Sequence, residues 1–224
     1  MALSYSGQLF QQRSLEAKSH AQNLLPMVSE CLDAAGVNLS DLDAIAVTLG
    51  PGSFTGVRIG LSVAQGLAFG ASLPLIGKNS LEVMAAPALQ KDANATVVTC
   101  LDARMGEVYW AAYEMSGGVM RERATPAVCS PEDFNVAVAG LSGALHGLGH
   151  GFVIESVSHD GFSVCEPGVL PHARDILRLL SNDEVLAAKS GARDYAIEPL
   201  YLRNEVAWEK RTRIRQQAPN TSAP

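Results

Sequence analysis

The sequence predicts an α/β fold with a mixed sheet. Short runs of strand-forming apolar residues alternate with apolar residues at helical spacing through the first half of the chain. Glycine- and proline-rich turns separate these segments. Three strand-like runs then follow one another without a helix between them. This order is typical of a sheet that joins parallel strand–helix units to an antiparallel meander.

The first half begins with a hairpin, because Ser6-Gly7 is a turn signal between two short strands. A helical pattern follows, with Ser19 as its N-cap and Gly36 as its stop. The expected elements are strands at 2–5 and 8–12, a helix at 19–36, a short buried strand at 44–48, a tight loop at 50–53, a helix to about residue 70, a strand at 75–77 and a helix after Ser80.

The second half begins with the meander, whose last two strands meet across Gly117-Gly118. Ser130-Pro131 reads as an N-cap with proline at the first helical position. The expected elements are strands at 97–102, 107–113 and 119–123, a helix after Pro131, a helix at 171–180, a late strand or extended segment at 201–203 and a disordered polar tail from Gln216.

Composition limits the possible functions. Apolar residues make up 47% of the 224-residue chain and charged residues 18%, which is an ordinary balance for a globular protein. The net charge is −6, so the chain by itself repels nucleic-acid phosphates. Contact with RNA would need a local basic patch or a basic partner.

The cysteines indicate a reducing compartment. Cys31, Cys100, Cys129 and Cys165 form no C-x-x-C pair and lack zinc-ligand spacing, so we expect free thiols. No apolar run approaches the ~20 residues of a membrane span. No basic segment leads into an apolar one at the start of the chain, so no signal peptide is visible. We expect a cytoplasmic protein without membrane contact.

The most informative segment is GPGSFTGVRIGLSVAQGLAFG, residues 50–70. Small residues recur at every fourth position, at Gly52, Gly56, Gly60 and Ala64, and form one stripe on a helix that is otherwise apolar nearly all round. Such a helix is buried, either in a core or at an interface. A phosphate site is less favoured, because no G-x-x-x-x-G-K-[ST] motif is present. A catalytic serine is also not favoured, because no G-x-S-x-G motif surrounds Ser53.

This segment and its continuation, GASLPLIGKNSLE, resemble the signature of the TsaB (YeaZ) family. LDARMGEVYWAAYE at 101–114, EPLYLRNEVAW at 198–208 and LLPMV at 24–28 are also similar to that family. The resemblance implies the actin, sugar-kinase and chaperone-ATPase (ASKHA) fold with two related α/β lobes, expected over 1–100 and 101–209. A basic, then polar, tail would follow over 210–224.

The resemblance also implies a role in making threonylcarbamoyladenosine beside the tRNA anticodon, as a paralogue and heterodimer partner of the catalytic subunit TsaD. The catalytic relative carries N-H-x-E-x-H after the glycine helix, and two histidines at i and i+4 share a helix face, as a metal site requires. Here the aligned stretch keeps Asn79 and Glu82 but has Ser80 and Met84 at the histidine positions. Hydroxyl and thioether groups are poor replacements for imidazole, so we expect no metal site and no catalysis.

Compared with its family, the chain also lacks a strand and an acidic phosphate-loop turn before Ala2. We therefore expect the N-terminal lobe to miss its first strand and to leave a sheet edge exposed, at a cost in stability.

The first two helices are expected to form the partner surface, because paralogues that share a packing surface can form pseudo-symmetric pairs. The expected interface residues are Leu24, Leu25, Val28, Gly52, Ser53, Phe54, Gly56, Arg58 and Gly60. We expect a homodimer when the partner is missing, a TsaE-type ATPase in the full complex, and only indirect contact with tRNA. No intrinsic cofactor is expected, and ATP is expected only in the complex.

Three further clusters have ordinary interpretations. His146 and His150 are four apart, but the surrounding glycines predict a strand and turn, which argues against a helical metal site. Asp102, Arg104 and Glu107 are expected to form a salt-bridged turn, with an acid–base site as the alternative. The basic run Lys210, Arg211, Arg213 and Arg215 is expected to be solvated, although it could touch tRNA or an acidic partner.

Two classes of function therefore remain. The first is a non-catalytic partner subunit. The alternative is a stand-alone enzyme of the same superfamily, either metallopeptidase-like or an ATPase, and the missing ligands, nucleophile motif and phosphate loops argue against it.

Overall fold

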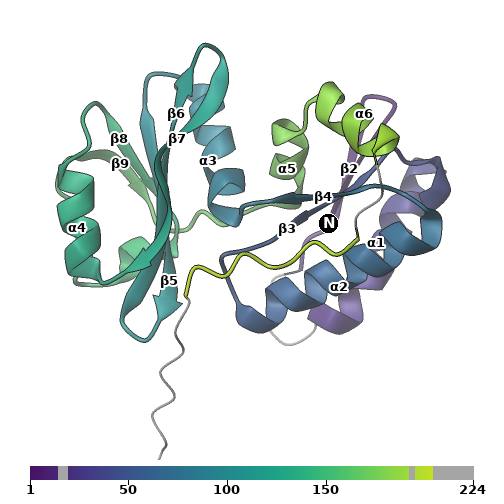
Figure 1. The fold of residues 1–224 in the computed structure, drawn as a ribbon, viewed down its shortest axis with the longest axis horizontal. Helices are drawn as coiled ribbons and strands as arrows, with labels where there is room; N and C mark the ends of the chain where they lie inside the picture. The colour runs from purple at the N-terminus through teal and green to yellow at the C-terminus, as the bar shows by residue number, and fades with distance from the viewer. Residues whose placement is uncertain (15–19, 192–194, 204–224) are drawn as a thin grey trace, which may run out of the picture.

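Two groups of strands divide the computed structural model into two lobes (Figure 1). The structure describes residues 1–14, 20–191 and 195–203. One lobe is built on a five-stranded sheet, and the other contains two separate two-stranded sheets with helices around them. The α/β class expected from the sequence is therefore confirmed.

The five-stranded sheet has the order β7-β6-β5-β8-β9. Its strands are β5 (Thr96–Arg104), β6 (Glu107–Ser116), β7 (Val119–Cys129), β8 (Leu145–Leu148) and β9 (Phe162–Glu166). The first three form the expected antiparallel meander, while β8 and β9 add to it in parallel. The sequence did not predict β9, which is short and mostly exposed.

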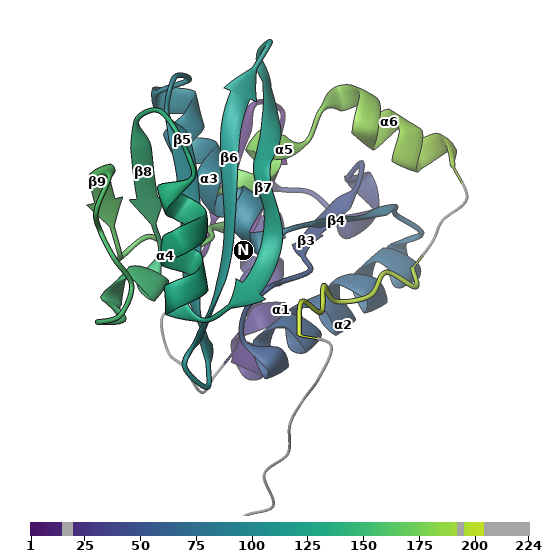
Figure 2. The same ribbon diagram turned by 60° about the vertical axis from the view of Figure 1, so that its left-hand side comes forward.

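Both faces of this sheet are covered, and Figure 2 shows α4 in front of the sheet with α3 behind it. The helix α4 (Pro131–Ala139) buries Phe134 against Trp110 and Phe152 through edge-on ring contacts. The helix α3 (Ser80–Lys91) packs on the other face, where Val97, Leu101 and residues of β6 meet it. Successive residues of β5 point to opposite faces, so the continuous buried run Thr96–Leu101 contributes to two cores.

The other lobe contains the expected hairpin and strand–helix units. Its elements are β1 (Ala2–Tyr5), β2 (Gln8–Gln11), α1 (His20–Ala35), the short 3-10 helix η1 (Leu39–Asp41), β3 (Ile45–Thr48), α2 (Phe54–Ala71) and β4 (Leu75–Lys78). Among the residues that the structure describes, β1 and β2 pair only with each other, and so do β3 and β4. The expected N-cap Ser19 lies outside the described residues.

The strand β3 differs from the prediction of a buried strand. Each of its residues, Ile45–Thr48, is only half-buried. The reason is topological, since β3 has a strand neighbour on one side only and a groove on the other.

The chain returns to this lobe at its C-terminal end. The helices α5 (Ala173–Leu179) and α6 (Asn182–Ser190) lie beside β3 and β4, and residues 195–203 run along α2 (Figure 1). The sequence did not predict α6, and 201–203 is extended without being a strand. The boundary expected between residues 100 and 101 falls inside β5. The returning helices α5 and α6 belong to the expected second lobe, 101–209, by sequence, but they lie beside strands of the first lobe.

A second 3-10 helix, η2 (His150–Val153), follows β8, so the glycine-rich stretch there is a strand and a turn, as expected. None of the helices in the described part of the chain is both long and apolar enough to cross a bilayer. The expected tail at 210–224 lies outside the described residues.

The aromatic contact on α4 should dominate the stability of the five-stranded lobe. Replacing fully buried Phe134 by alanine should lower the free energy of unfolding by about 3–5 kcal/mol, because it removes two ring contacts and leaves a cavity. Val136→Ala on the same helix is the control, since that side chain is 76% exposed and its loss should cost less than about 0.5 kcal/mol. If urea denaturation shows the same loss in the free energy of unfolding for both variants, this explanation is wrong.

Candidate partner interface

The start of α2 is held in place by local hydrogen bonds. Ser53 is the N-cap, and its Oγ accepts a hydrogen bond from the N–H of Gly56 at 3.3 Å. The carbonyl of Gly50 accepts from the N–H of Ser80 at 2.8 Å, which ties this loop to the start of α3. Ser53 therefore has a structural role here, in line with the absence of a nucleophile motif.

An exposed aromatic–cation stack lies on the first turn of α2. The Phe54 side chain is 70% exposed, and the guanidinium carbon of Arg58 lies 3.3 Å from its ring centroid. The same guanidinium donates to the Tyr201 hydroxyl at 2.5 Å. Arg58 is thus fixed between a residue of its own helix and one that lies 143 positions further along the chain.

The small-residue stripe turns as it follows the helix. Gly60 and Ala64 line the groove beside β3, so this half of the stripe faces the interior of the lobe. A Cβ atom at Gly60 would meet nothing within 4 Å, whereas one at Gly56 would lie 3.3 Å from the Ser53 side chain. The outward part of the expected interface is therefore the first turn, from Gly52 to Arg58.

The expected residues of α1 also divide between two directions. Leu24 and Val28 both line the groove, and Val28 is only 6% exposed, so it is a core residue. Leu25 points outward and is 52% exposed. Because α1 and α2 pack against each other, the exposed residues Leu25 and Phe54 belong to one helical layer (Figure 1).

A C-terminal strap, residues 195–203, covers another side of α2. The Gln65 amide donates to the carbonyls of Tyr195 and Ile197 at 2.8 and 3.1 Å, and the N–H of Leu200 donates to the Leu49 carbonyl. The sequence predicted a strand or extended segment at 201–203, but no local pattern indicated that residues 195–203 would lie along α2.

The residues aligned with the catalytic motif of the family are structural. Asn79 is the N-cap of α3, and its Oδ1 accepts from the N–H of Leu81 at 2.8 Å. Glu82, three positions after the cap, interacts in turn with the Asn79 backbone N–H. The two retained residues thus stabilise the start of a helix.

The two positions that the resemblance aligns with histidines of the catalytic relative are buried. Ser80 and Met84 are 4% and 2% exposed. A Cβ atom on Gly149 would lie 2.7 Å from the Met84 methyl carbon, so the thioether closes over this turn after β8. Met84 therefore fills core space beside this turn.

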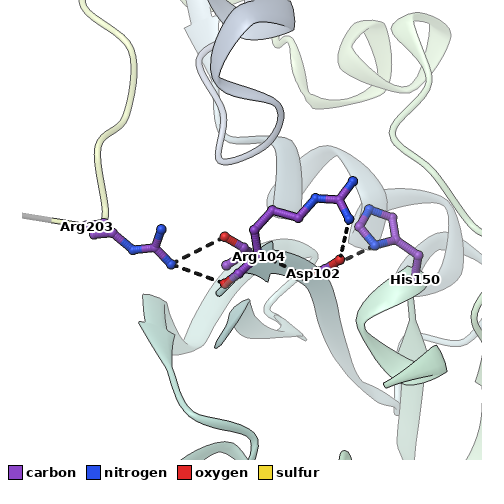
Figure 3. A network of polar contacts seen from close by, with 5 residues as sticks. Asp102, Arg104, His150 and Arg203 are labelled. Carbon is purple, nitrogen blue, oxygen red and sulfur yellow. Dashed lines mark hydrogen bonds and ion pairs between the residues drawn. The ribbon is translucent and has the colours of Figure 1, made fainter. Parts of the chain in front are cut away.

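The polar cluster at the end of β5 is a salt-bridged turn, as expected (Figure 3). Arg104 pairs with Asp102 at 3.1 Å, and Arg203 of the strap pairs with Glu107. Arg203 also donates to the carbonyl of Ala103 at 3.3 Å. This contact ties the strap to the turn between β5 and β6, and so connects the two lobes.

The two histidines considered for metal binding are placed differently. His146 lies on β8, whereas His150 lies in η2, where its Nδ1 accepts from the N–H of Asp102 at 3.1 Å. Burial lowers the pKa of His150, which keeps its ring in the neutral form that accepts this bond. Within residues 1–14, 20–191 and 195–203, no three His, Cys, Asp or Glu side chains are grouped to hold a metal.

Comparison with known proteins places this geometry in a family. Residues 14–158 match the family model described as "TsaD: tRNA N6-adenosine threonylcarbamoyltransferase". A protein of Escherichia coli named "tRNA threonylcarbamoyladenosine biosynthesis protein TsaB" is 42% identical over 197 residues, which cover 86% of this chain and 84% of that protein. The chain belongs to the TsaB (YeaZ) family.

Further relatives support the same assignment. The TsaB protein of Haemophilus influenzae is 36% identical, with 94% of this chain and 91% of the relative covered. The solved structure titled "YeaZ from Pseudomonas aeruginosa" has a TM-score of 0.77 and 38% identity, and covers 90% of this chain and 92% of that one. A second structure, of an uncharacterized protein "with similarity to peptidase YEAZ" from the same organism, has a TM-score of 0.79 and 37% identity and covers 90% and 93%. The expected ASKHA-type fold of the TsaB family is thereby confirmed.

The capping glutamate of this TsaB-family chain should make stability depend on pH. Burial raises the pKa of Glu82, and nearby Glu122 and Glu184 add to the shift, while Lys78 and the Asn79 N–H oppose it. The folded chain then binds the Glu82 proton more tightly than the unfolded chain, so its contribution to stability is lost as pH rises through the folded pKa.

Glu82→Gln should therefore raise the melting temperature at pH 7, because glutamine keeps an acceptor for the Asn79 N–H without the buried charge. The gain should vanish at a pH below about 4, where glutamate is protonated in both states. Glu132→Gln, an exposed glutamate in the first turn of α4, is the control and should show no gain at pH 7. A melting temperature of Glu82→Gln at pH 7 below that of the unsubstituted chain would contradict this explanation.

Proposed function

We propose that the chain is a non-catalytic partner subunit that binds a TsaD-type enzyme in the synthesis of threonylcarbamoyladenosine in tRNA. The relatives named TsaB support the pathway. The observation that carries the non-catalytic role is the pair Ser80 and Met84, both buried in the core at the positions of the catalytic relative's histidines.

This pair removes the chemistry that a metal would supply. A histidine offers a nitrogen ligand to zinc or iron, whereas a methionine sulfur and a serine hydroxyl bind such ions poorly. The remaining polar residues of the motif, Asn79 and Glu82, are engaged in capping α3. Metal-assisted hydrolysis or transfer is therefore assigned to the partner.

The layer of α1 and the first turn of α2 is the best surface for that partner. Leu25 and Phe54 are large apolar side chains exposed on it, and Arg58 is held in a fixed orientation between two aromatic rings. Aromatic and arginine side chains contribute most to binding energy at protein interfaces. Without the partner, the same surface would pair two copies of this chain in a symmetric homodimer.

The wider complex follows from the same role. The net charge of −6 disfavours direct binding of tRNA, so we assign RNA contact mainly to the partner. We place a TsaE-type ATPase and ATP in the complex, and we assign no cofactor to this chain alone. Modification of tRNA and four free cysteines agree with a cytoplasmic location.

A mixing assay tests the proposal. The purified chain alone should retain no stoichiometric zinc or iron by elemental analysis, and should cleave neither peptides nor glycopeptides. Together with a TsaD-type subunit and the other components of the reaction, it should form a complex and raise the yield of modified tRNA. About one metal ion per purified chain would favour the stand-alone enzyme. Full tRNA modification in the absence of this chain would contradict the proposed role as a partner subunit.

The interface can be tested with Phe54→Ala, which truncates an exposed side chain and should leave the fold intact. The affinity for the TsaD-type partner should fall about tenfold, as expected for an aromatic interface residue worth more than ~1 kcal/mol. Val136→Ala on α4, equally exposed in the other lobe, should leave the affinity unchanged. Equal affinities of the two variants for the partner in a calorimetric titration would show that the start of α2 is not part of the interface.

A further inference from the structure

Arg58 is a single cation in the helical layer that α1 and α2 form. The rest of α2, within Phe54–Ala71, contains no charged side chain. The helix α1, His20–Ala35, contains the acidic residues Glu30 and Asp33 but no lysine or arginine. Arg58 is therefore one fixed positive charge on a layer whose other exposed features near it are apolar and aromatic.

Two aromatic side chains hold the guanidinium of Arg58 in one orientation. Its central carbon lies 3.3 Å from the ring centroid of Phe54 and 5.2 Å from that of Tyr201. Its two terminal nitrogens donate to the Phe54 carbonyl at 3.4 Å and to the Tyr201 hydroxyl at 2.5 Å. Because Phe54 lies on α2 and Tyr201 on the C-terminal strap, the side chain is restricted by two separate segments that lie side by side (Figure 1).

The guanidinium keeps unused donors and has no counter-charge in the described part of the chain. An arginine side chain has five N–H donors, and the contacts with Phe54 and Tyr201 use two of them. None of the described carboxylates forms an ion pair with Arg58, whereas Arg203 on the same strap is paired with Glu107. A planar group of donors that is already held in place matches the two oxygens of a carboxylate.

The surroundings of Arg58 favour a carboxylate on a protein over a phosphate on RNA. Phe54, Leu200 and Tyr201 are 70%, 36% and 50% exposed. The Leu200 N–H donates to the Leu49 carbonyl at 2.8 Å, which places this part of the strap beside the loop that leads into α2. Such apolar neighbours exclude water when a protein covers them, and so strengthen a charge pair among them. Nucleic-acid phosphates are bound by several cations together, and neither α1 nor α2 supplies a second lysine or arginine.

We propose that Arg58 is a carboxylate-binding residue, and that its ligand is an aspartate or glutamate side chain of the TsaD-type partner. This inference rests on the proposed function. The partner's carboxylate accepts two hydrogen bonds in the plane of the guanidinium, on an edge that Phe54 and Tyr201 leave free. Tyr201 is a positioning residue, because its hydroxyl accepts from one terminal nitrogen and so fixes how the guanidinium is turned. The C-terminal strap is thus part of the partner site together with the two helices.

Two variants that remove the same charge test the role of Arg58. Arg58→Gln is compared with Arg121→Gln, which changes an exposed arginine on β7 in the other lobe. The dissociation constant of the complex with a TsaD-type subunit is measured by calorimetric titration at low and high salt. Arg58→Gln should weaken binding at least about tenfold at low salt and reduce its salt dependence, because a charge pair at the interface is lost. Arg121→Gln should change the affinity less than about twofold.

Two further variants test the geometry. Tyr201→Phe keeps the ring and removes the hydroxyl, so it should weaken binding about three- to tenfold when Arg58 is present and have no further effect in the Arg58→Gln background. If the ring acts through packing alone, Tyr201→Phe leaves the affinity unchanged, which contradicts the positioning role. Arg58→Lys keeps the charge but not the planar donors, and should bind at least about fivefold more weakly than the unsubstituted chain. Melting temperatures of all variants verify that they are folded.

The outcomes separate this inference from the proposed function. If the unsubstituted chain does not bind the TsaD-type subunit, the proposed function is wrong and the inference is wrong with it. If the chain binds, but Arg58→Gln behaves as Arg121→Gln does or Arg58→Lys binds as tightly as the unsubstituted chain, the carboxylate site is wrong while the partner role stands. If Arg58→Gln weakens only the binding of tRNA by the complex, Arg58 contacts phosphate, and the inference is overturned.

Discussion

The packing of α3 between the two lobes is the contact on which the rest of the structure depends. Leu81, Met84 and Leu89 on this helix are buried against β5 and β6, while its other side meets α5 of the first lobe. The hydrogen bond from Arg178 to Gln90 lies at that second contact. A helix that must fill two interfaces has little room for an open metal site, because a catalytic metal needs a free coordination position and access for substrate. The burial of Ser80 and Met84 is part of this tight packing of α3.

Most of the fold was predictable because its signals are local. The apolar runs of β5 and β6, the Gly117-Gly118 turn and the Ser130-Pro131 helix start each depend on a few adjacent residues. The strap and α6 were not predictable in the same way. The strap is held by contacts such as Arg58 to Tyr201, whose partners are distant in sequence, and α6 has no buried side chain to give it an apolar period.

The candidate site was predictable only in part, for a geometric reason. Small residues at every fourth position advance by about 40° per step around a helix, so a stripe that begins on an outer surface ends on an inner one. Gly52 and Gly56 therefore lie near the exposed stack of Phe54 and Arg58, whereas Gly60 and Ala64 face the groove. Spacing alone could identify the stripe but could not say where it changes from surface to core, because that depends on where β3 lies.

The C-terminal strap contacts both lobes near the proposed partner surface. Tyr201 holds Arg58 on α2, and two residues later Arg203 holds the turn between β5 and β6 through Glu107 and the Ala103 carbonyl. A partner that contacts the start of α2 would therefore touch a residue already coupled to the other lobe. These contacts hold the strap in place although none of residues 195–203 is buried. The boundary between the lobes on this side therefore depends on a few polar contacts of Tyr201 and Arg203, and not on an apolar core.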